Sequence, residues 1–78
     1  MHYDLVDLRV FAAVVEEGNL TRGAQRCNLA PSSVSARVRA LEDEVGSLLL
    51  ERRQRGVAPT PAGRVLAEAV AGQAERFD

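Results

Sequence analysis

Two helical patterns in this chain are separated by only three residues, "NLA". The first pattern covers residues 20–27, and Asn19 before it can accept a backbone hydrogen bond as an N-cap. Three apolar residues share one side of it: Leu20, Ala24 and Cys27. Asn28 tolerates the left-handed conformation that ends many helices, and the second pattern covers residues 31–45. Two helices joined by so short a connection predict a helix-turn-helix.

The second of these helices is expected to bury one side and to expose the other. Pro31 suits its first position, where a missing N–H costs nothing, and Gly46 ends it. The buried side is predicted from apolar residues at helical spacing: Val34, Val38, Leu41 and Val45. At about 100° per residue, the opposite face comprises Ser32, Ala36, Arg39 and Asp43, flanked by Ser33, Ser35 and Ala40. Small and polar side chains in the first turns, with the acidic residues at the end, favour a helix that enters a nucleic-acid groove.

A further helix is predicted over residues 5–17, with Asp4 or Asp7 as its N-cap and Gly18 as its end. Its apolar side is predicted from helical spacing: Leu5, Leu8, Phe11, Ala12 and Val15. This helix is expected to serve as a scaffold for the two helices that follow.

After residue 46 the apolar residues no longer follow helical spacing and occur in short runs instead. The apolar segments 48–50 and 57–59 predict two short strands, and the polar connection "ERRQRG" makes them a β-hairpin. Thr60 can then cap a last helix that begins with Pro61. The apolar stripe of this helix continues to the end of the chain: Leu66, Val70, Gln73 and Phe77, with Ala62, Val65 and Ala69 beside it. Such a stripe is typical either of a dimer interface or of a truncated chain.

Length and cysteine content limit what can stabilise the fold. A chain of 78 residues forms one small domain, and such domains bury only about 60% of their unfolded surface. Cys27 is the only cysteine, so no intrachain disulfide can form, and with the single His2 it cannot make a metal site of ordinary ligand count. Cys27 is expected to be a small buried apolar residue rather than a redox sensor. Self-association is therefore the expected source of additional stability.

Several functional classes find no support in the sequence. No run of about 18 apolar residues occurs, so no membrane span is predicted. The first ten residues lack the basic and apolar regions of a secretion signal, so a cytoplasmic protein is expected. No nucleophile–base pair, glycine-rich phosphate loop or pair of catalytic carboxylates occurs, and we therefore expect no enzyme activity, no cofactor and no metal.

The net charge of −1 at first argues against a nucleic-acid partner, but the charges are unevenly distributed. Residues 1–17 carry one arginine against four acidic residues, net −3, whereas residues 22–55 carry seven arginines against four acidic residues, net +3. All basic residues are arginines, whose planar fork suits phosphate and guanine edges. A GC-rich genome explains the absence of lysine equally well.

Five blocks of sequence occur in a characteristic order over about residues 4–66: Leu41-Glu42, Val45-Gly46, Leu50-Glu51-Arg52, Gly56, and Thr60-Pro61-Ala62-Gly63. In these blocks the chain resembles the amino-terminal DNA-binding domain of LysR-type transcriptional regulators. The chain departs from the family at three positions. Ala30 leaves helix 31–45 without a capping hydroxyl unless Ser32 or Ser33 takes over, Ala36 replaces a frequent arginine, and Leu50 replaces phenylalanine.

The resemblance implies a mainly α, winged helix-turn-helix fold, with a three-helix core and a two-stranded β wing over residues 1–59. Residues 60–78 would form a long linker and dimerisation helix. The implied function is sequence-specific binding of double-stranded promoter DNA by a homodimer in the bacterial cytoplasm, at the nucleoid. A small-molecule effector would bind only through a carboxy-terminal domain that is absent here.

Three groups of residues are the candidate DNA contacts. Helix 31–45 would contact base edges in the major groove through Ser32, Ser33, Ala36, Arg37 and Arg39. The wing would contact the minor groove or phosphates through Arg52, Arg53 and Arg55. Helix starts would contact phosphates through Asn19, Thr21, Arg22, Pro31 and Thr60.

Each of these three groups can also be interpreted without DNA. The helix face and the arginine cluster can simply be solvated, and the helix-start residues can be caps that contact no phosphate. By its angle on the helix, Arg37 lies nearer the core edge than Arg39 and can reach phosphate rather than base. For the whole domain, the alternative is a winged-helix protein-interaction module without specific DNA binding.

Overall fold

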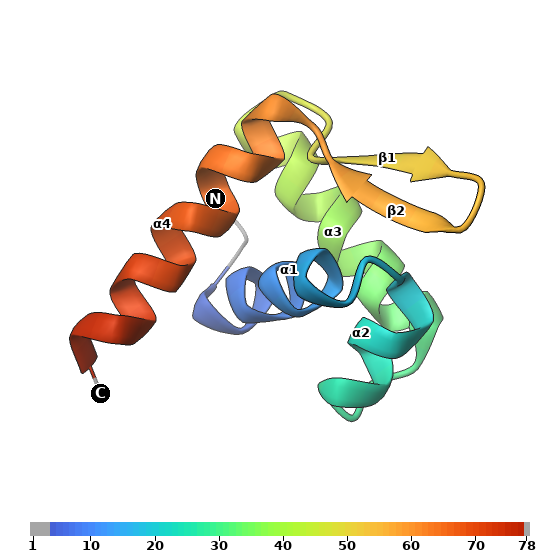
Figure 1. Ribbon diagram of the computed structural model, residues 1–78, viewed down its shortest axis with the longest axis horizontal. Coiled ribbons are helices and arrows are strands. Elements are labelled where there is room, and N and C mark those ends of the chain that lie inside the picture. Colours follow the sequence, from blue (N-terminus) through green and yellow to red (C-terminus); the bar gives the residue numbers. More distant parts are fainter. Residues whose placement is uncertain (1–3, 78) are drawn as a thin grey trace.

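Over residues 4–77, which the computed structural model describes with side chains up to residue 72, three helices and a β-hairpin precede a long last helix (Figure 1). The elements in chain order are α1 (Leu5–Glu17), α2 (Leu20–Arg26), α3 (Pro31–Val45), β1 (Leu50–Arg53), β2 (Gly56–Pro59) and α4 (Pro61–Phe77). This arrangement confirms the predicted winged helix-turn-helix fold, in which three helices surround one core and the hairpin forms the wing.

The ends of α1 are fixed by the residues that the sequence suggests. Asp4 accepts a hydrogen bond from the backbone N–H of Asp7 at 3.0 Å, and Asp7 accepts one from the backbone N–H of Asp4 at 3.2 Å. This reciprocal arrangement is a capping box. Gly18 ends the helix with a φ of 64°, a left-handed conformation that glycine adopts without strain. Both candidate caps therefore take part, Asp4 as the N-cap and Asp7 as its partner.

The connection between α2 and α3 is a tight turn whose backbone groups are bonded locally. Asn19 caps α2 by accepting a hydrogen bond from the backbone N–H of Arg22 at 2.9 Å. α2 ends at Arg26, one residue earlier than predicted, and Asn28 takes the expected left-handed conformation with a φ of 61°. The backbone N–H of Leu29 then donates to a carbonyl of α2 at 2.9 Å, which turns the chain toward α3.

The core lies where α1, α2 and α3 meet. Its buried members are Val10, Phe11, Val14, Ala24, Val34, Val38, Leu41 and Leu49. The predictions for Leu5 and Val45 are wrong, because these side chains are 51% and 47% exposed. The buried side of α1 includes Val10 and Val14 instead, since α1 packs against α2, α3 and α4 and is apolar on more than one side. Val45 lies in the last turn of α3, and the connection that follows supplies Leu49 to the core instead.

The wing, which we define as β1, β2 and the turn between them, differs from the prediction in its first strand. β1 begins at Leu50 and pairs antiparallel with β2, whereas Leu48 is 69% exposed and lies outside the strand. Glu42 of α3 explains the shift. Its Oε2 accepts hydrogen bonds from the backbone N–H groups of Leu49 at 2.8 Å and Leu50 at 3.3 Å, and so holds the apolar run against α3. The charged residues that follow can still form the strand, because the hydrogen bonds between paired strands come from backbone groups and not from side chains.

The wing is fixed to the end of α1 close to its turn, which Arg53 and Gly56 flank. The backbone N–H of Val57 donates to the carbonyl of Gly18 at 3.1 Å. Gly56 has a φ of 137°, and a Cβ on it would lie 2.1 Å from the same carbonyl oxygen, so only glycine fits there. Backbone contacts therefore set the orientation of the wing relative to the three helices.

The apolar stripe predicted for α4 is only partly buried. Val70 is buried and Leu66 is half-buried, whereas Val65 and Ala69 are exposed, because α4 packs against α1 and β2 on one side only. The last two residues of the predicted stripe, Gln73 and Phe77, lie outside the described side chains. Within residues 4–77, no helix combines the length and the apolar character that crossing a membrane requires.

Candidate nucleic-acid interface

The first turns of α3 present small and polar side chains to solvent. We call four of these exposed residues the exposed α3 face: Ser32, Ser33, Ala36 and Arg39. On the opposite side of the same turns, Val34 and Val38 are buried in the core and fix the rotation of the helix about its axis. Of the side chains that the sequence predicts to face outward, all but the half-buried Ser35 are exposed.

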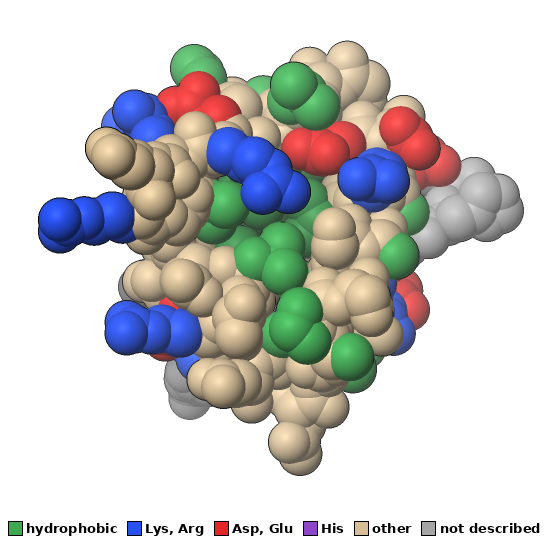
Figure 2. All heavy atoms as spheres, turned by 90° about the vertical axis from the view of Figure 1, so that its right-hand side faces the viewer, with side chains coloured by type: hydrophobic (Ala, Val, Ile, Leu, Met, Phe, Trp, Pro, Cys, Tyr) green, Lys and Arg blue, Asp and Glu red, His purple; other side chains and the backbone are tan. Residues whose placement is uncertain are grey.

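The beginning of α3 and the wing lie on the same side of the molecule, while α4 lies on the other side (Figure 1). Figure 2 shows the side that carries the wing, and there arginine side chains lie around a central apolar area. A duplex placed against this side could meet the exposed α3 face and the wing together. This is the arrangement that a winged helix needs in order to hold a recognition helix in the major groove.

The wing carries three exposed arginines: Arg52, Arg53 and Arg55. Arg53 pairs with Glu51 of the same strand, with 2.5 Å between Nη2 and Oε1, and both side chains are well exposed, so water screens the pair. Arg55 lies in the turn, and Arg52 points to the opposite face of the strand from Arg53. Among the described residues, neither Arg52 nor Arg55 has an acidic side chain within ion-pair distance.

Two further arginines within residues 22–55, the part of the chain with net charge +3, are bonded to α1. Arg26 contacts Glu16 through Nη2 at 2.6 Å and Glu17 through Nη1 at 3.2 Å. These hydrogen bonds, the one with Glu16 foremost, raise the pKa of Arg26 above its usual value. Arg37, a candidate DNA contact, donates from Nη1 to Oδ1 of Asp7 at 2.6 Å. The sequence analysis missed both contacts, because periodicity gives no signal for partners that meet only in the folded chain.

The candidate residues at helix starts divide into caps and exposed side chains. Asn19 caps α2, and Thr60 is the predicted cap of α4, since its Oγ1 accepts a hydrogen bond from the backbone N–H of Gly63 at 3.1 Å. The Thr60 hydroxyl also donates to the carbonyl of Leu48 at 2.6 Å. The exposed members of the group are Thr21, Arg22 and Pro31. Asn19 and Thr60 therefore have structural roles whether or not they also contact phosphate.

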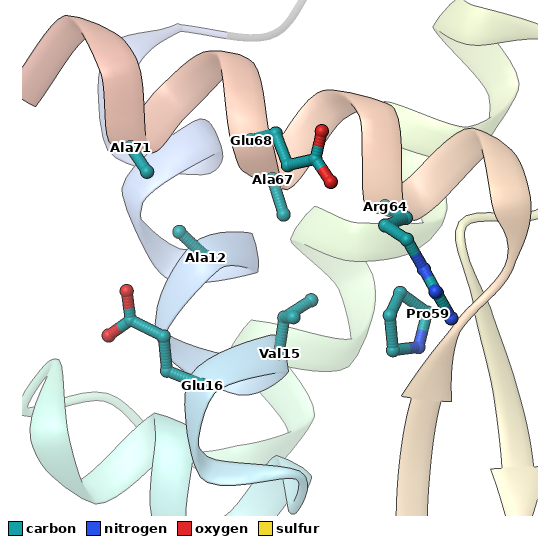
Figure 3. Close-up of a pocket in the computed structure, with 8 residues that line it drawn as sticks. All are labelled: Ala12, Val15, Glu16, Pro59, Arg64, Ala67, Glu68 and Ala71. Carbon is teal, nitrogen blue, oxygen red and sulfur yellow. The ribbon is translucent and has the colours of Figure 1, made fainter.

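A shallow groove lies between α1 and α4 (Figure 3). Its apolar lining comprises Ala12, Val15, Pro59, Ala67 and Ala71. The charged side chains of Glu16, Arg64 and Glu68 also line it. Part of the apolar lining belongs to α4, the helix that the sequence analysis expects to pair two subunits.

Metal-ligating side chains do not gather in the described part of the chain. No group of three or more His, Cys, Asp or Glu residues there could hold a metal ion. Cys27 is half-buried and packs against the core, so it contributes to apolar packing although it is less enclosed than expected.

Together, the short turn between α2 and α3, the exposed α3 face and the hairpin beside it define a winged helix-turn-helix protein. Residues 5–64 match the family model described as bacterial regulatory helix-turn-helix protein, lysR family. The chain therefore belongs to the LysR family of bacterial regulatory proteins.

Similar proteins of known description are transcriptional regulators. The chain is 47% identical over 64 residues to the RuBisCO operon transcriptional regulator of Allochromatium vinosum, covering 82% of this chain and 21% of that protein. It is 43% identical over 63 residues to the HTH-type transcriptional regulator PgrR of Escherichia coli, covering 81% of this chain and 21% of that protein. The chain thus spans about a fifth of the length of the curated relatives it matches.

Solved structures share the fold. The BenM DNA-binding domain in complex with catB site 1 DNA superposes with a TM-score of 0.89 at 36% identity, covering 96% of this chain and 83% of that chain. The CbnR DNA-binding domain in complex with DNA gives a TM-score of 0.86 at 32% identity, covering 95% of this chain and 85% of that chain.

Proposed function

We propose that this chain is the DNA-binding domain of a LysR-type transcriptional regulator and that it binds double-stranded promoter DNA sequence-specifically. The observation that carries the proposal is the exposed α3 face, which is held outward by buried Val34 and Val38 on the side of the molecule that bears the wing. The family membership and the DNA complexes of similar domains support it. Such a protein acts by binding rather than by catalysis, at the nucleoid of a bacterial cytoplasm.

Base recognition is assigned to the exposed α3 face. The hydroxyls of Ser32 and Ser33 can donate to or accept from any base edge, and the Ala36 methyl group can contact a thymine methyl group. Arg39 can bind guanine with two hydrogen bonds or bind a phosphate. These residues occupy the first turns of α3, which is where recognition helices approach the bases.

Backbone contacts are assigned to the wing and to the helix starts. Arg52, Arg53 and Arg55 would insert at the minor groove or bind phosphates, Arg53 after exchanging Glu51 for a phosphate. The residues proposed to lie near phosphates at helix starts are Asn19, Thr21, Arg22, Pro31 and Thr60. Contacts of this kind position the protein on the duplex without selecting its sequence.

Two copies would pair through α4, within residues 60–78, and leave residues 1–59 of each copy to bind one half-site. The exposed apolar residues of α4 and the groove between α1 and α4 support this arrangement. A two-fold dimer places its recognition helices on half-sites separated by one or more turns of duplex. A small-molecule effector would act through a part of the regulator that these 78 residues do not include. No finding favours the alternative of a protein-interaction module.

The proposal is tested by titrating duplex DNA with the chain at increasing salt concentration. Each phosphate that an arginine neutralises contributes about −0.9 to the slope of log affinity against log salt. Four arginines among the candidate contacts have no acidic partner within residues 4–72: Arg22, Arg39, Arg52 and Arg55. If these bind phosphates, we expect a slope of about −3 to −4 per subunit.

The control is an acidic polypeptide of equal charge, and a selection from random duplexes measures preference. Arg55→Ala should weaken binding to all sequences alike, whereas Ser33→Ala should change which sequences bind best. A flat salt dependence, or equal affinity for the polypeptide and for every duplex, would overturn the proposal.

A further inference from the structure

Asp7 is the one charged residue that is buried among those the structure describes, with 7% of its surface exposed. Both of its carboxylate oxygens are engaged. Oδ2 accepts a hydrogen bond from the backbone N–H of Asp4 at 3.2 Å, and Oδ1 accepts one from Nη1 of Arg37 at 2.6 Å. A carboxylate at the start of α1 is thus bonded to an arginine in the middle of α3.

The angular position of Arg37 on α3 explains why it reaches α1. At about 100° per residue, Arg37 stands about 60° from the buried Val34, whereas Ala36 stands about 160° from it. Arg37 therefore leaves α3 at the edge of the core, beside the exposed α3 face and not on it. Its side chain is 38% exposed, and its guanidinium extends toward α1.

The ion pair opposes a contact between Arg37 and DNA. If the guanidinium moved to a phosphate, it would leave the Asp7 carboxylate buried without a cation, which is strongly unfavourable. If a phosphate came to the intact pair, it would meet the negative charge of Asp7 as well as the positive charge of Arg37. Arg39, two residues along the same helix, is exposed and has no acidic side chain within ion-pair distance among the described residues.

We propose that Asp7 keeps Arg37 from contacting DNA, so that Arg37 positions α3 against α1 and base choice is left to the exposed α3 face. This inference rests on the proposed DNA-binding function. It reassigns Arg37 from the candidate DNA contacts to a positioning residue and makes Asp7, a residue of α1, the group that holds Arg37 away from the duplex.

The test compares Arg37→Gln, Asp7→Asn and the matched control Arg39→Gln by duplex binding at several salt concentrations and by selection from random duplexes. Arg37→Gln should keep both the salt slope and the preferred sequence of the unaltered chain. Arg39→Gln should flatten the slope by about 0.9 or change the preferred sequence. Asp7→Asn releases Arg37 and should steepen the slope by about 0.9, and adding Arg37→Gln to it should restore the original slope.

A flatter slope or an altered preference in Arg37→Gln would overturn the inference, as would an unchanged slope in Asp7→Asn. If circular dichroism shows that either variant is unfolded, Arg37→Lys decides, since it keeps the charge beside Asp7 but cannot bind guanine as a fork. An unchanged preferred sequence in Arg37→Lys supports the inference, and a changed one overturns it. If the unaltered chain binds no duplex at all, the proposed DNA-binding function itself is overturned. If the unaltered chain binds but the variants behave otherwise than expected, only the inference about Asp7 and Arg37 is overturned.

Discussion

At Gly23, the backbones of α1 and α2 approach so closely that no side chain fits between them. A Cβ at this position would lie 2.7 Å from Cγ2 and 2.8 Å from Cα of Val14. Val14 is fully buried, so it cannot move aside without disturbing the close-packed core. Gly72 in α4 is the opposite case, since nothing lies within 4 Å of the position its Cβ would take.

These two glycines make a matched pair for a stability measurement. Gly23→Ala should lower the free energy of unfolding by about 1–3 kcal/mol, because it overpacks the contact between α1 and α2. Gly72→Ala should raise the free energy of unfolding by about 0.5–1 kcal/mol, because alanine restricts the unfolded chain and favours helix. Urea denaturation measures both values, and equal effects at the two positions would contradict this account of the packing.

Between elements, one carboxylate links α3 to the wing. Oε2 of Glu42, in α3, accepts hydrogen bonds from two successive backbone N–H groups, those of Leu49 just before the wing and of Leu50 at its first position. Bonds to an ionised acceptor are stronger than bonds to a neutral one. The position of β1 relative to α3 therefore depends on the charge of this side chain.

Glu42→Gln should loosen this connection without unfolding the domain. Gln keeps a neutral acceptor, so we expect the free energy of unfolding to fall by about 1–2 kcal/mol. We also expect faster hydrogen exchange at the amides of Leu49 and Leu50, which NMR can follow. Asp43→Asn, an exposed change on the same helix, is the control and should leave those amides unaffected. Equal exchange rates in the two variants would exclude this role for Glu42.

Local patterns and caps predicted the helices better than the strands. Asp4, Asn19 and Gly18 act as caps and end residues because their signals are local to the backbone they bond. The first strand was predicted from the apolar run that ends at Leu50, but that run is held by Glu42 from a different element. The spacing of apolar residues carries no signal for such a contact, and the strand therefore begins two residues later than the apolar run predicts.

At the scale of the whole molecule, the unburied apolar surface of α4 supports association of two copies. Val65 lies in α4 and is 69% exposed, so the outer side of this helix carries an apolar side chain that a second copy could cover. A domain of this size also has a small core, which a second copy could extend. The same association would double the number of arginines that meet one duplex.

Val65→Arg should weaken this association while leaving the folded monomer intact. A charge at the interface of two copies is costly, whereas an exposed substitution changes the free energy of unfolding by only about 0.5 kcal/mol. Sedimentation equilibrium measures the dimer dissociation constant, and Val45→Arg, a similarly exposed valine at the end of α3, is the control. A dimer equally stable in both variants, or only monomer in the unaltered chain, would remove α4 from the interface.

The candidate interface was predictable where it follows one helix and unpredictable where it depends on the tertiary fold. Ser33 and Ala36 are exposed because their position relative to Val34 and Val38 follows from helical geometry alone. Arg37 lies in the same turns of α3 as Ser33 and Ala36. Its partner Asp7, however, lies 30 residues earlier in the chain and becomes a neighbour only after α1 packs against α3.

The bond between Val57 and Gly18 joins the wing to the corner between α1 and α2, one residue beyond the Arg53–Gly56 pair that flanks the turn. Because this anchorage uses only main-chain atoms and two glycines, it is independent of the side chains at the tip. Substitutions at Gln54 or Arg55 can therefore alter what the tip binds while the tip stays at the same distance from α3. The side chains of the turn thus determine what the wing contacts, and the main chain determines where the wing lies.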